Sequence, residues 1–381
     1  MKKTAAFLLA LCLLTSPVWA VDTLAEDTFT LTCSAAVLLE RESGGVIYEK
    51  SAHEHHAIAS VTKVMTLLLI AEAIERGDIT LDTVVTGSAR AASMGGSQIW
   101  LREGEQFSVA DMLKCVAVVS ANDCSVALAE HLAGSEEAFV ARMNRRAAEL
   151  GLTNTSFTNC TGLFESENHY SSAYDIAVMA SELLRHEFIK DYTGIWMDSI
   201  RDGRSELVNT NRLIRTYDGA TGLKTGFTTK AMYCLAASAA RDGTEYIAVI
   251  LHDETSEKRF QSARSLLDYA FANYTTASLR PQEALAPVLV QLGAVNSVQP
   301  VFEGSEKVLL EKSELFSLLY DIEVAESVTA PVKAGQQLGS MRVYSGEKLL
   351  AEVSLVAENE VGRLSVFAVF QQLLMRLFGA E

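Results

Sequence analysis

The order of strand-like and helix-like segments constrains the fold of this chain more than any other feature. Residues 34–50 read SAAVLLERESGGVIYEK, two apolar runs around a Gly-Gly turn, which predicts a β-hairpin. Helical patterns follow, and strand patterns then return in GLKTGFTTK and in AMYCLAASAARDGTEYIAVILHD, which turns at Arg-Asp-Gly. Strands at both ends of a helical region predict an antiparallel sheet whose distant parts pair in space around a helical insertion, an α/β fold of the α+β kind.

The helical patterns cover residues 60–76, 109–132, 135–150 and 172–184, and the first three stop at a glycine, as helices often do. A further helix, from Arg259 to Asn273, closes this region. Residues 276–357 differ, because they hold short β-like runs between Gly, Ser and charged turns, such as PVLVQL, KVLLEK, GSMRVYS and KLLAEVSLVA. We therefore expect an α/β domain over residues 21–275 and a small all-β domain over residues 276–357.

The two ends of the chain have different patterns. Residues 1–20, MKKTAAFLLALCLLTSPVWA, place two lysines before an apolar stretch and small residues near a cleavage point, which predicts a signal peptide. In residues 358–381 a helical wheel gives one broad apolar face, formed by Val366, Phe367, Phe370, Leu373, Leu374, Leu377 and Phe378. This predicts an amphipathic helix that anchors the protein at a membrane surface, with docking on its own chain or a second copy as the alternative.

Charge and cysteine content narrow the choice of partner and cofactor. Loss of residues 1–20 removes two of the 32 basic residues and changes the formal net charge from −16 to −18. Such an acidic excess disfavours nucleic acid as a partner. Five of the 6 cysteines remain, and their odd number without a C-x-x-C pair predicts buried small hydrophobes, not a zinc site or a disulfide framework.

One group of histidines has the composition of a metal site but not its spacing. His53, Glu54, His55 and His56 do not form H-E-x-x-H, and residues at i, i+2 and i+3 do not converge on one helical face. We interpret them as a solvated loop and expect neither metal nor cofactor.

A lysine inside an apolar helical run is the first sign of chemistry. In ASVTKVM, Lys63 follows Ser60 by three residues, so that both lie on one face of a helix. Burial disfavours the charged form of a lysine and would make Lys63 a usable base near neutral pH. Alone, the pattern fits an ordinary helix-capping serine with an extended lysine better.

Two further stretches change this interpretation. SANDCSVALAEHL places Ser120 and Asn122 at the start of another helical pattern, and TGLKTGFTT places Lys224, Thr225 and Gly226 on a strand. The motifs S-x-x-K, S-x-N and K-T-G, in this order, are the signature of penicillin-binding proteins and serine β-lactamases. With the surrounding segments, the chain resembles the low-molecular-mass penicillin-binding proteins that act as serine D-alanyl-D-alanine carboxypeptidases.

The resemblance implies a role for each motif residue. Ser60 would attack the carbonyl between the two terminal D-alanines of a peptidoglycan stem peptide, and Lys63 would take its proton. Ser120 would relay a proton between Lys63, Lys224 and the leaving amine. Asn122 would orient Lys63 and form a hydrogen bond with the substrate amide. β-Lactams would acylate Ser60 and leave slowly.

The remaining implied residues bind and orient the substrate. Lys224 and Thr225 would hold its terminal carboxylate, and Gly226 would let it lie along the strand edge. The backbone N–H groups of Ser60 and Phe227 would form an oxyanion hole. Arg212 would either shape the carboxylate end of the site or be an ordinary surface arginine.

Three residues invite a structural test. His169 matches a segment near the rim of the site in this family, where it would serve either the site or the fold. Cys124 and Met232 depart from the family pattern, the first standing where a small residue is common and the second where glycine is common. Cys124 would be either inert packing or a thiol open to oxidation.

Alternatives within and beyond the superfamily remain. A class A β-lactamase needs a glutamate in an E-x-x-L-N loop, and none of Glu165, Glu167 and Glu206 lies in that pattern. A D,D-endopeptidase could use the same residues on cross-linked peptidoglycan, and a non-catalytic β-lactam sensor would keep the pocket without turnover. We expect an exported carboxypeptidase on the outer face of the cytoplasmic membrane.

Overall fold

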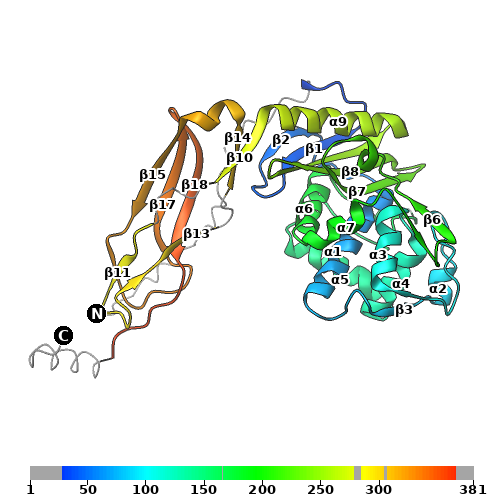
Figure 1. The fold of residues 1–381 in the computed structure, drawn as a ribbon, viewed down its shortest axis with the longest axis horizontal. Helices are drawn as coiled ribbons and strands as arrows, with labels where there is room; N and C mark the ends of the chain where they lie inside the picture. Colours follow the sequence, from blue (N-terminus) through cyan, green and yellow to red (C-terminus); the bar gives the residue numbers. More distant parts are fainter. Residues whose placement is uncertain (1–27, 165, 279–284, 304–306, 366–381) are drawn as a thin grey trace, which may run out of the picture. The chain divides into compact units, whose positions relative to one another are not determined.

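A five-stranded antiparallel sheet organises the larger part of the chain. The computed structural model describes residues 28–164, 166–278, 285–303 and 307–365, which divide between residues 276 and 277 into a larger and a smaller unit (Figure 1). The sheet has the order β2-β1-β9-β8-β7, with the bounds β1 (Ala35–Glu40), β2 (Val46–Lys50), β7 (Ala220–Thr228), β8 (Met232–Arg241) and β9 (Thr244–Asp253). Because β1 pairs with β9, from Ala35 opposite Leu251 to Glu40 opposite Tyr246, the predicted meeting of the two distant parts is confirmed.

Helices cover both faces of this sheet. Figure 1 shows α9 (Ser256–Asn273) along one face and the inserted helices on the other. The main inserted helices are α1 (Lys63–Glu75), α3 (Val109–Val118), α4 (Asn122–Ala133), α5 (Glu136–Glu149) and α6 (Ala173–Leu184). Helix α1 has the low amphipathicity of a helix packed on all sides, and most of its residues are buried. The predicted α/β fold with a helical insertion is confirmed.

Short elements complete the larger unit. Two hairpins are formed by β3 (Val84–Thr86) with β4 (Gln106–Ser108) and by β5 (Met197–Ile200) with β6 (Ser205–Val208). The short helices are η2 (Ala59–Thr62), α2 (Ala89–Ala92), η3 (Glu187–Ile189), α7 (Lys190–Thr193) and α8 (Leu213–Thr216).

The predicted single helix over residues 109–132 is wrong, because the chain breaks between α3 and α4. At the break Ser120 has φ +63°, a left-handed conformation that a non-glycine residue adopts only when its surroundings hold it there. Val118 O accepts a hydrogen bond from Thr210 N instead of continuing the helix. The apolar pattern runs across the break because both helices are buried.

Two helix starts also differ from their predictions. The first turn predicted at Ser60 is a 3-10 turn, η2, and the α-helix begins at Lys63. Helix α9 begins three residues before the predicted Arg259, where the Thr255 hydroxyl accepts a hydrogen bond from Lys258 N. This N-cap was not identified in the sequence.

The smaller unit is built from strands, as the sequence predicted. Its sheets have the orders β12-β11-β16 and β13-β18-β17-β15. The elements are β11 (Val288–Gln291), β12 (Ser297–Val298), β13 (Pro300–Phe302), β14 (Lys307–Glu311), η4 (Lys312–Ser317), β15 (Leu318–Val324), β16 (Ser327–Thr329), β17 (Gln337–Ser345) and β18 (Lys348–Ala357), and β10 (Tyr274–Ser278) spans the division between the units.

The predicted C-terminal helix is tested only at its start. Val361 and Arg363 form isolated β-bridges with Val332 and Gly293 of the smaller unit, and the described part of residues 358–381 is not helical. The apolar residues from Val366 onward, and the predicted signal peptide, lie outside the described residues. Among the residues described, no helix combines the length and apolarity needed to cross a bilayer.

The described cysteines behave as buried hydrophobes. Cys33, Cys115, Cys124, Cys160 and Cys234 are all free thiols in the interior. This confirms the prediction that these cysteines are buried small hydrophobes.

Leu68→Ala should lower the free energy of unfolding of the larger unit by about 3 kcal/mol, because Leu68 is fully buried in α1 and its loss leaves a cavity. Val84→Ala, at a side chain that is 55% exposed, should change it by less than about 0.5 kcal/mol. Tryptophan fluorescence during denaturant unfolding measures this unit, since Trp100 and Trp196 both lie in it. Equal effects of the two substitutions would contradict the packing described for α1.

Candidate active site

Ser60 lies on a 3-10 turn that is fixed by its own hydrogen bonds. Val61 N donates to Ile58 O at 3.1 Å, and the Thr62 hydroxyl donates to Ala59 O at 2.7 Å. Ala59 has φ +47°, a conformation that other contacts must stabilise. The turn therefore presents Ser60, which is half-buried, at the start of α1.

Two glycines allow other segments to approach this turn closely. A Cβ on Gly226 of β7 would lie 2.7 Å from Ile58 O and 3.2 Å from Ser60 N. A Cβ on Gly162 would lie 1.8 Å from Ala59 O. The sequence assigns Gly226 a role in admitting substrate, and the structure adds that the serine turn also requires the missing side chain.

Lys63 makes the central contacts of the site. Its Nζ lies 2.9 Å from Ser60 Oγ, 2.6 Å from Asn122 Oδ1 and 2.9 Å from Thr161 O. The side chain is fully buried, and burial lowers its pKa from 10.5 to about 7. The sequence pattern predicted both the serine contact and the direction of this shift.

The break between α3 and α4 places the S-x-N motif beside Lys63. Asn122 N donates to Ser97 O, and Asn122 Nδ2 donates to Gly95 O, both at 2.7 Å. These bonds leave Oδ1 of Asn122 directed at Lys63. Ser120 is also buried, and its hydroxyl has no hydrogen-bond partner among the residues that the structure describes.

Asp123 fixes the loop that orients Asn122. Its buried carboxylate accepts hydrogen bonds from Ile99 N and Leu101 N, each at 3.0 Å. Sequence reasoning missed this residue, although an acid next to the motif asparagine could have signalled it. Asp123 therefore holds the same loop whose Gly95 and Ser97 carbonyls bind Asn122.

His169 supports the serine turn from within the fold. Its Nε2 lies 2.7 Å from the Thr62 hydroxyl, which donates its proton to Ala59 O, so Nε2 must carry the hydrogen. Nδ1 then accepts from Thr158 N at 3.1 Å. Burial lowers the pKa of His169 to about 4, so the ring stays neutral. Of the two roles open from the sequence, the structure assigns the supporting one.

The K-T-G residues lie on the edge strand β7. Lys224 is fully buried, and burial together with the charge of Lys63 lowers its pKa well below the usual value. Its Nζ lies 3.4 Å from Thr225 O, and the Thr225 hydroxyl donates to Thr210 Oγ1 at 2.8 Å. Three distant segments thus contribute to one site the side chains of Ser60, Lys63, Ser120, Asn122 and Lys224.

Behind this strand lies an arginine that sequence reasoning did not identify. Arg259 of α9 is buried, and its Nη1 donates to Gly226 O at 2.9 Å and to Cys234 O at 3.2 Å. It therefore fixes the backbone next to Phe227. Burial lowers its pKa to about 10.

The two other predicted binding residues are exposed. The side chain of Phe227 is 55% exposed. Arg212 is 62% exposed, and its Nη1 lies 3.7 Å from Glu257 Oε2. The charge of Arg212 also contributes to the lowered pKa of Arg259, so the two arginines lie near each other.

The residues that depart from the family pattern also have structural explanations. Cys124 is fully buried, and burial raises the pKa of its thiol, which favours inert packing over reactivity. Met232 begins β8 with φ +52°, which explains why glycine would suit this position.

Two members of the histidine group of residues 53–56 have contacts of their own. His56 pairs with Ser171 through its backbone, and the ring of His55 stacks on that of Tyr170, with 4.2 Å between the ring centres.

Comparison with known proteins shows which family the chain belongs to. The family model for D-alanyl-D-alanine carboxypeptidase matches residues 22–255, and the model for the C-terminal domain of penicillin-binding protein 5 matches residues 274–363. The carboxypeptidase DacF of Bacillus subtilis is 44% identical over 332 residues, 86% of this chain and 85% of that protein.

Solved structures extend the comparison to the fold. Penicillin-binding protein 5 of Haemophilus influenzae is 29% identical, with a TM-score of 0.78 over 88% of this chain and 99% of the other. Penicillin-binding protein D2 of Listeria monocytogenes in its ampicillin-bound form is also 29% identical, with a TM-score of 0.59 over 64% of this chain and 99% of the other. The chain belongs to the family of serine-type D-alanyl-D-alanine carboxypeptidases.

Proposed function

We propose that this enzyme removes the terminal D-alanine from peptidoglycan stem pentapeptides through an acyl-enzyme on Ser60. The observation that carries this assignment is the buried Lys63 amine, 2.9 Å from the serine oxygen and with a pKa lowered to about 7. A neutral amine at this distance can accept the serine proton near neutral pH.

Acylation follows from these contacts. Lys63 takes the proton of Ser60, and the serine oxygen attacks the carbonyl carbon between the two D-alanines. The C–N bond then breaks, and the departing amine receives a proton through the buried Ser120 hydroxyl. Asn122 and the Thr161 carbonyl keep the Lys63 amine in place throughout. Water then hydrolyses the ester and releases the shortened peptide.

The developing negative charge requires donors next to Ser60. We assign this role to the backbone N–H groups of Ser60 and Phe227. The close approach of Gly226 to the serine turn supports the assignment, because it brings the two segments together. Arg259 holds the Gly226 carbonyl and so preserves their spacing.

The terminal carboxylate of the substrate would bind at Lys224 and Thr225. A cation and a hydroxyl on neighbouring positions of an edge strand suit a carboxylate. A bound carboxylate would also favour the charged form of Lys224, which burial otherwise disfavours. Arg212 adds positive charge near this end of β7 from a more exposed position.

β-Lactams should acylate the same serine and leave slowly. Glu167 and Glu206 are both exposed, which argues against either one as the base that activates a deacylating water. The ampicillin-bound form of the Listeria relative supports acylation in this family.

The site of action would be outside the cytoplasmic membrane, where peptidoglycan lies. The predicted signal peptide of residues 1–20 would export the chain, and the apolar face predicted from Val366 to Phe378 would bind it to the membrane surface. Stem peptides of the wall are then within reach of the anchored enzyme.

Ser60→Ala should reduce D-alanine release from a short acyl-D-Ala-D-Ala peptide by a factor of about 10³ or more, because the acyl-enzyme can no longer form. Ser93→Ala, at an exposed serine, should leave the rate unchanged. Penicillin should stop release by the unaltered enzyme. A protein that penicillin labels at Ser60 but that releases no D-alanine would contradict the carboxypeptidase and favour cross-linked peptides or a sensing role.

Acylation by penicillin should be slow at pH 5 and rise about tenfold per pH unit up to a plateau above pH 7, because only the neutral form of Lys63 accepts the serine proton. Lys63→Arg should reduce the plateau by a factor of about 10² or more, since arginine stays charged. Lys258→Arg on the surface is the control. A rate constant that does not change between pH 5 and 8 would exclude Lys63 as the base.

A protein that ends at Ser365 should fail to sediment with liposomes, whereas the longer protein should bind them. Within the full chain, Phe370→Asp on the predicted apolar face should weaken binding, and Gln372→Asp on the opposite face should not. Equal binding by all of these proteins would refute the membrane role of the tail.

A further inference from the structure

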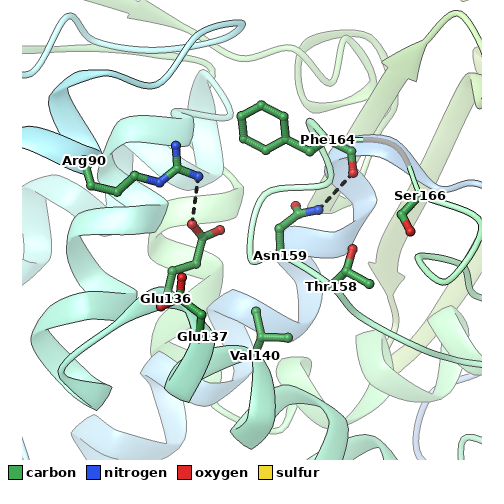
Figure 2. A pocket seen from close by; sticks show the side chains of 8 residues that line it. All are labelled: Arg90, Glu136, Glu137, Val140, Thr158, Asn159, Phe164 and Ser166. Carbon is green, nitrogen blue, oxygen red and sulfur yellow. Dashed lines mark hydrogen bonds and ion pairs between the residues drawn. The ribbon is translucent and has the colours of Figure 1, made fainter.

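Phe164 lines two hollows near the site. An open cleft of about 520 Å³ is lined by Leu163, Phe164, Phe227, Thr228 and Thr229. A second hollow of about 230 Å³ also has Phe164 in its lining, together with Arg90, Glu136, Glu137, Val140, Thr158, Asn159 and Ser166 (Figure 2). The two hollows therefore share one aromatic wall.

The direction of β7 shows which part of a substrate would enter the first cleft. The carboxylate end of the substrate is assigned to Lys224 and Thr225, and the scissile carbonyl to the N–H of Phe227. A chain that continues along this edge must pass Thr228 and Thr229. The acyl part of the stem peptide therefore runs between Phe227 and Phe164, which are 55% and 49% exposed.

The second hollow is polar and its walls are fixed. Arg90 Nη2 lies 3.1 Å from Glu136 Oε2, and the guanidinium lies over the Phe164 ring at 5.5 Å from its centre. Asn159 Nδ2 donates to Phe164 O at 3.0 Å (Figure 2). Arg90 is preorganised by these contacts, and its side chain is still 46% exposed.

A negative group completes the lining. Glu137 follows Glu136 at the first turn of α5, and its carboxylate is open to solvent. Hydrogen bonds from its own backbone N–H and from Ser135 lower its pKa, so that it stays ionised. Besides the Arg90–Glu136 ion pair, the hollow thus offers a second carboxylate, that of Glu137, and Figure 2 shows Arg90 and both glutamates on the same side of Asn159.

We propose that this second hollow binds the side-chain end of the stem-peptide diamino acid when that end carries both a carboxylate and an ammonium group. Arg90 binds the carboxylate and Glu137 the ammonium, while the aliphatic part of the side chain crosses the Phe164 ring. The diamino acid directly precedes the D-alanine whose carbonyl is attacked, so it lies in the first cleft. The inference rests on the proposed function and gives it a preference for diaminopimelate over lysine.

The test uses three acyl peptides that end in D-Ala-D-Ala and differ in the preceding residue. This residue is diaminopimelate, diaminopimelate with its side-chain carboxylate amidated, or lysine. For the full-length enzyme, kcat/KM of D-alanine release should be about ten- to a hundredfold higher for free diaminopimelate than for the other two, which is the range of one charge-assisted contact.

Arg90→Gln should remove this preference. It should lower kcat/KM about tenfold or more for the diaminopimelate peptide and leave the amidated and lysine peptides, as well as acylation by penicillin, unchanged. Arg102→Gln, at an exposed arginine of the same unit, is the matched control and should change none of these values.

The other outcomes distinguish a failure of the pocket assignment from a failure of the proposed function. Equal losses on all three peptides would mean that Arg90 only supports the segment that ends at Phe164, and no loss on any would mean that it does not bind substrate. Either result overturns the pocket assignment alone. An unaltered enzyme that releases D-alanine from none of the three peptides would contradict the proposed function itself.

Discussion

The buried amine of Lys63 is the interaction on which the rest of the site depends. A lysine in the interior is stable only where its donors are satisfied, and here Ser60, Asn122 and Thr161 each provide an acceptor. The same burial that makes the position unfavourable for a charge lowers its pKa to about 7. The burial that disfavours a charged Lys63 in a helix core is therefore the property that would let it activate the serine, as we propose.

The fold is arranged so that three distant segments approach the serine turn and the Lys63 amine. The turn of residues 59–62 starts α1, the break after α3 supplies Asn122, the loop at Thr161 supplies a carbonyl, and β7 approaches through Gly226. The neutral ring of His169 connects this loop region to the serine turn. Strained backbone at residues 59 and 120 is held by these contacts, as is common at catalytic sites.

Much of the site could be predicted from the sequence. The features that the sequence did not reveal share one cause, because each depends on how the chain folds. Ser60, Lys63, Ser120, Asn122 and Lys224 were identified because their chemistry resides in side chains at fixed spacings. The Thr161 carbonyl could not be identified, since every residue has one and only the fold selects which approaches Lys63. The break at Ser120 was missed because an apolar pattern does not distinguish one buried helix from two, and the requirement for Gly226 depends on a segment more than 160 residues away.

The most direct test of this account is the pKa of Lys63 itself, measured by NMR titration of the enzyme with isotope-labelled lysine side chains. The spectrum of Lys63→Arg identifies the resonance, because that signal alone should be missing. We expect the Lys63 signal to titrate with a midpoint near pH 7, apart from surface lysines that titrate near 10.5. A midpoint near 10.5 would mean that Lys63 is charged at neutral pH, and the serine would need another base.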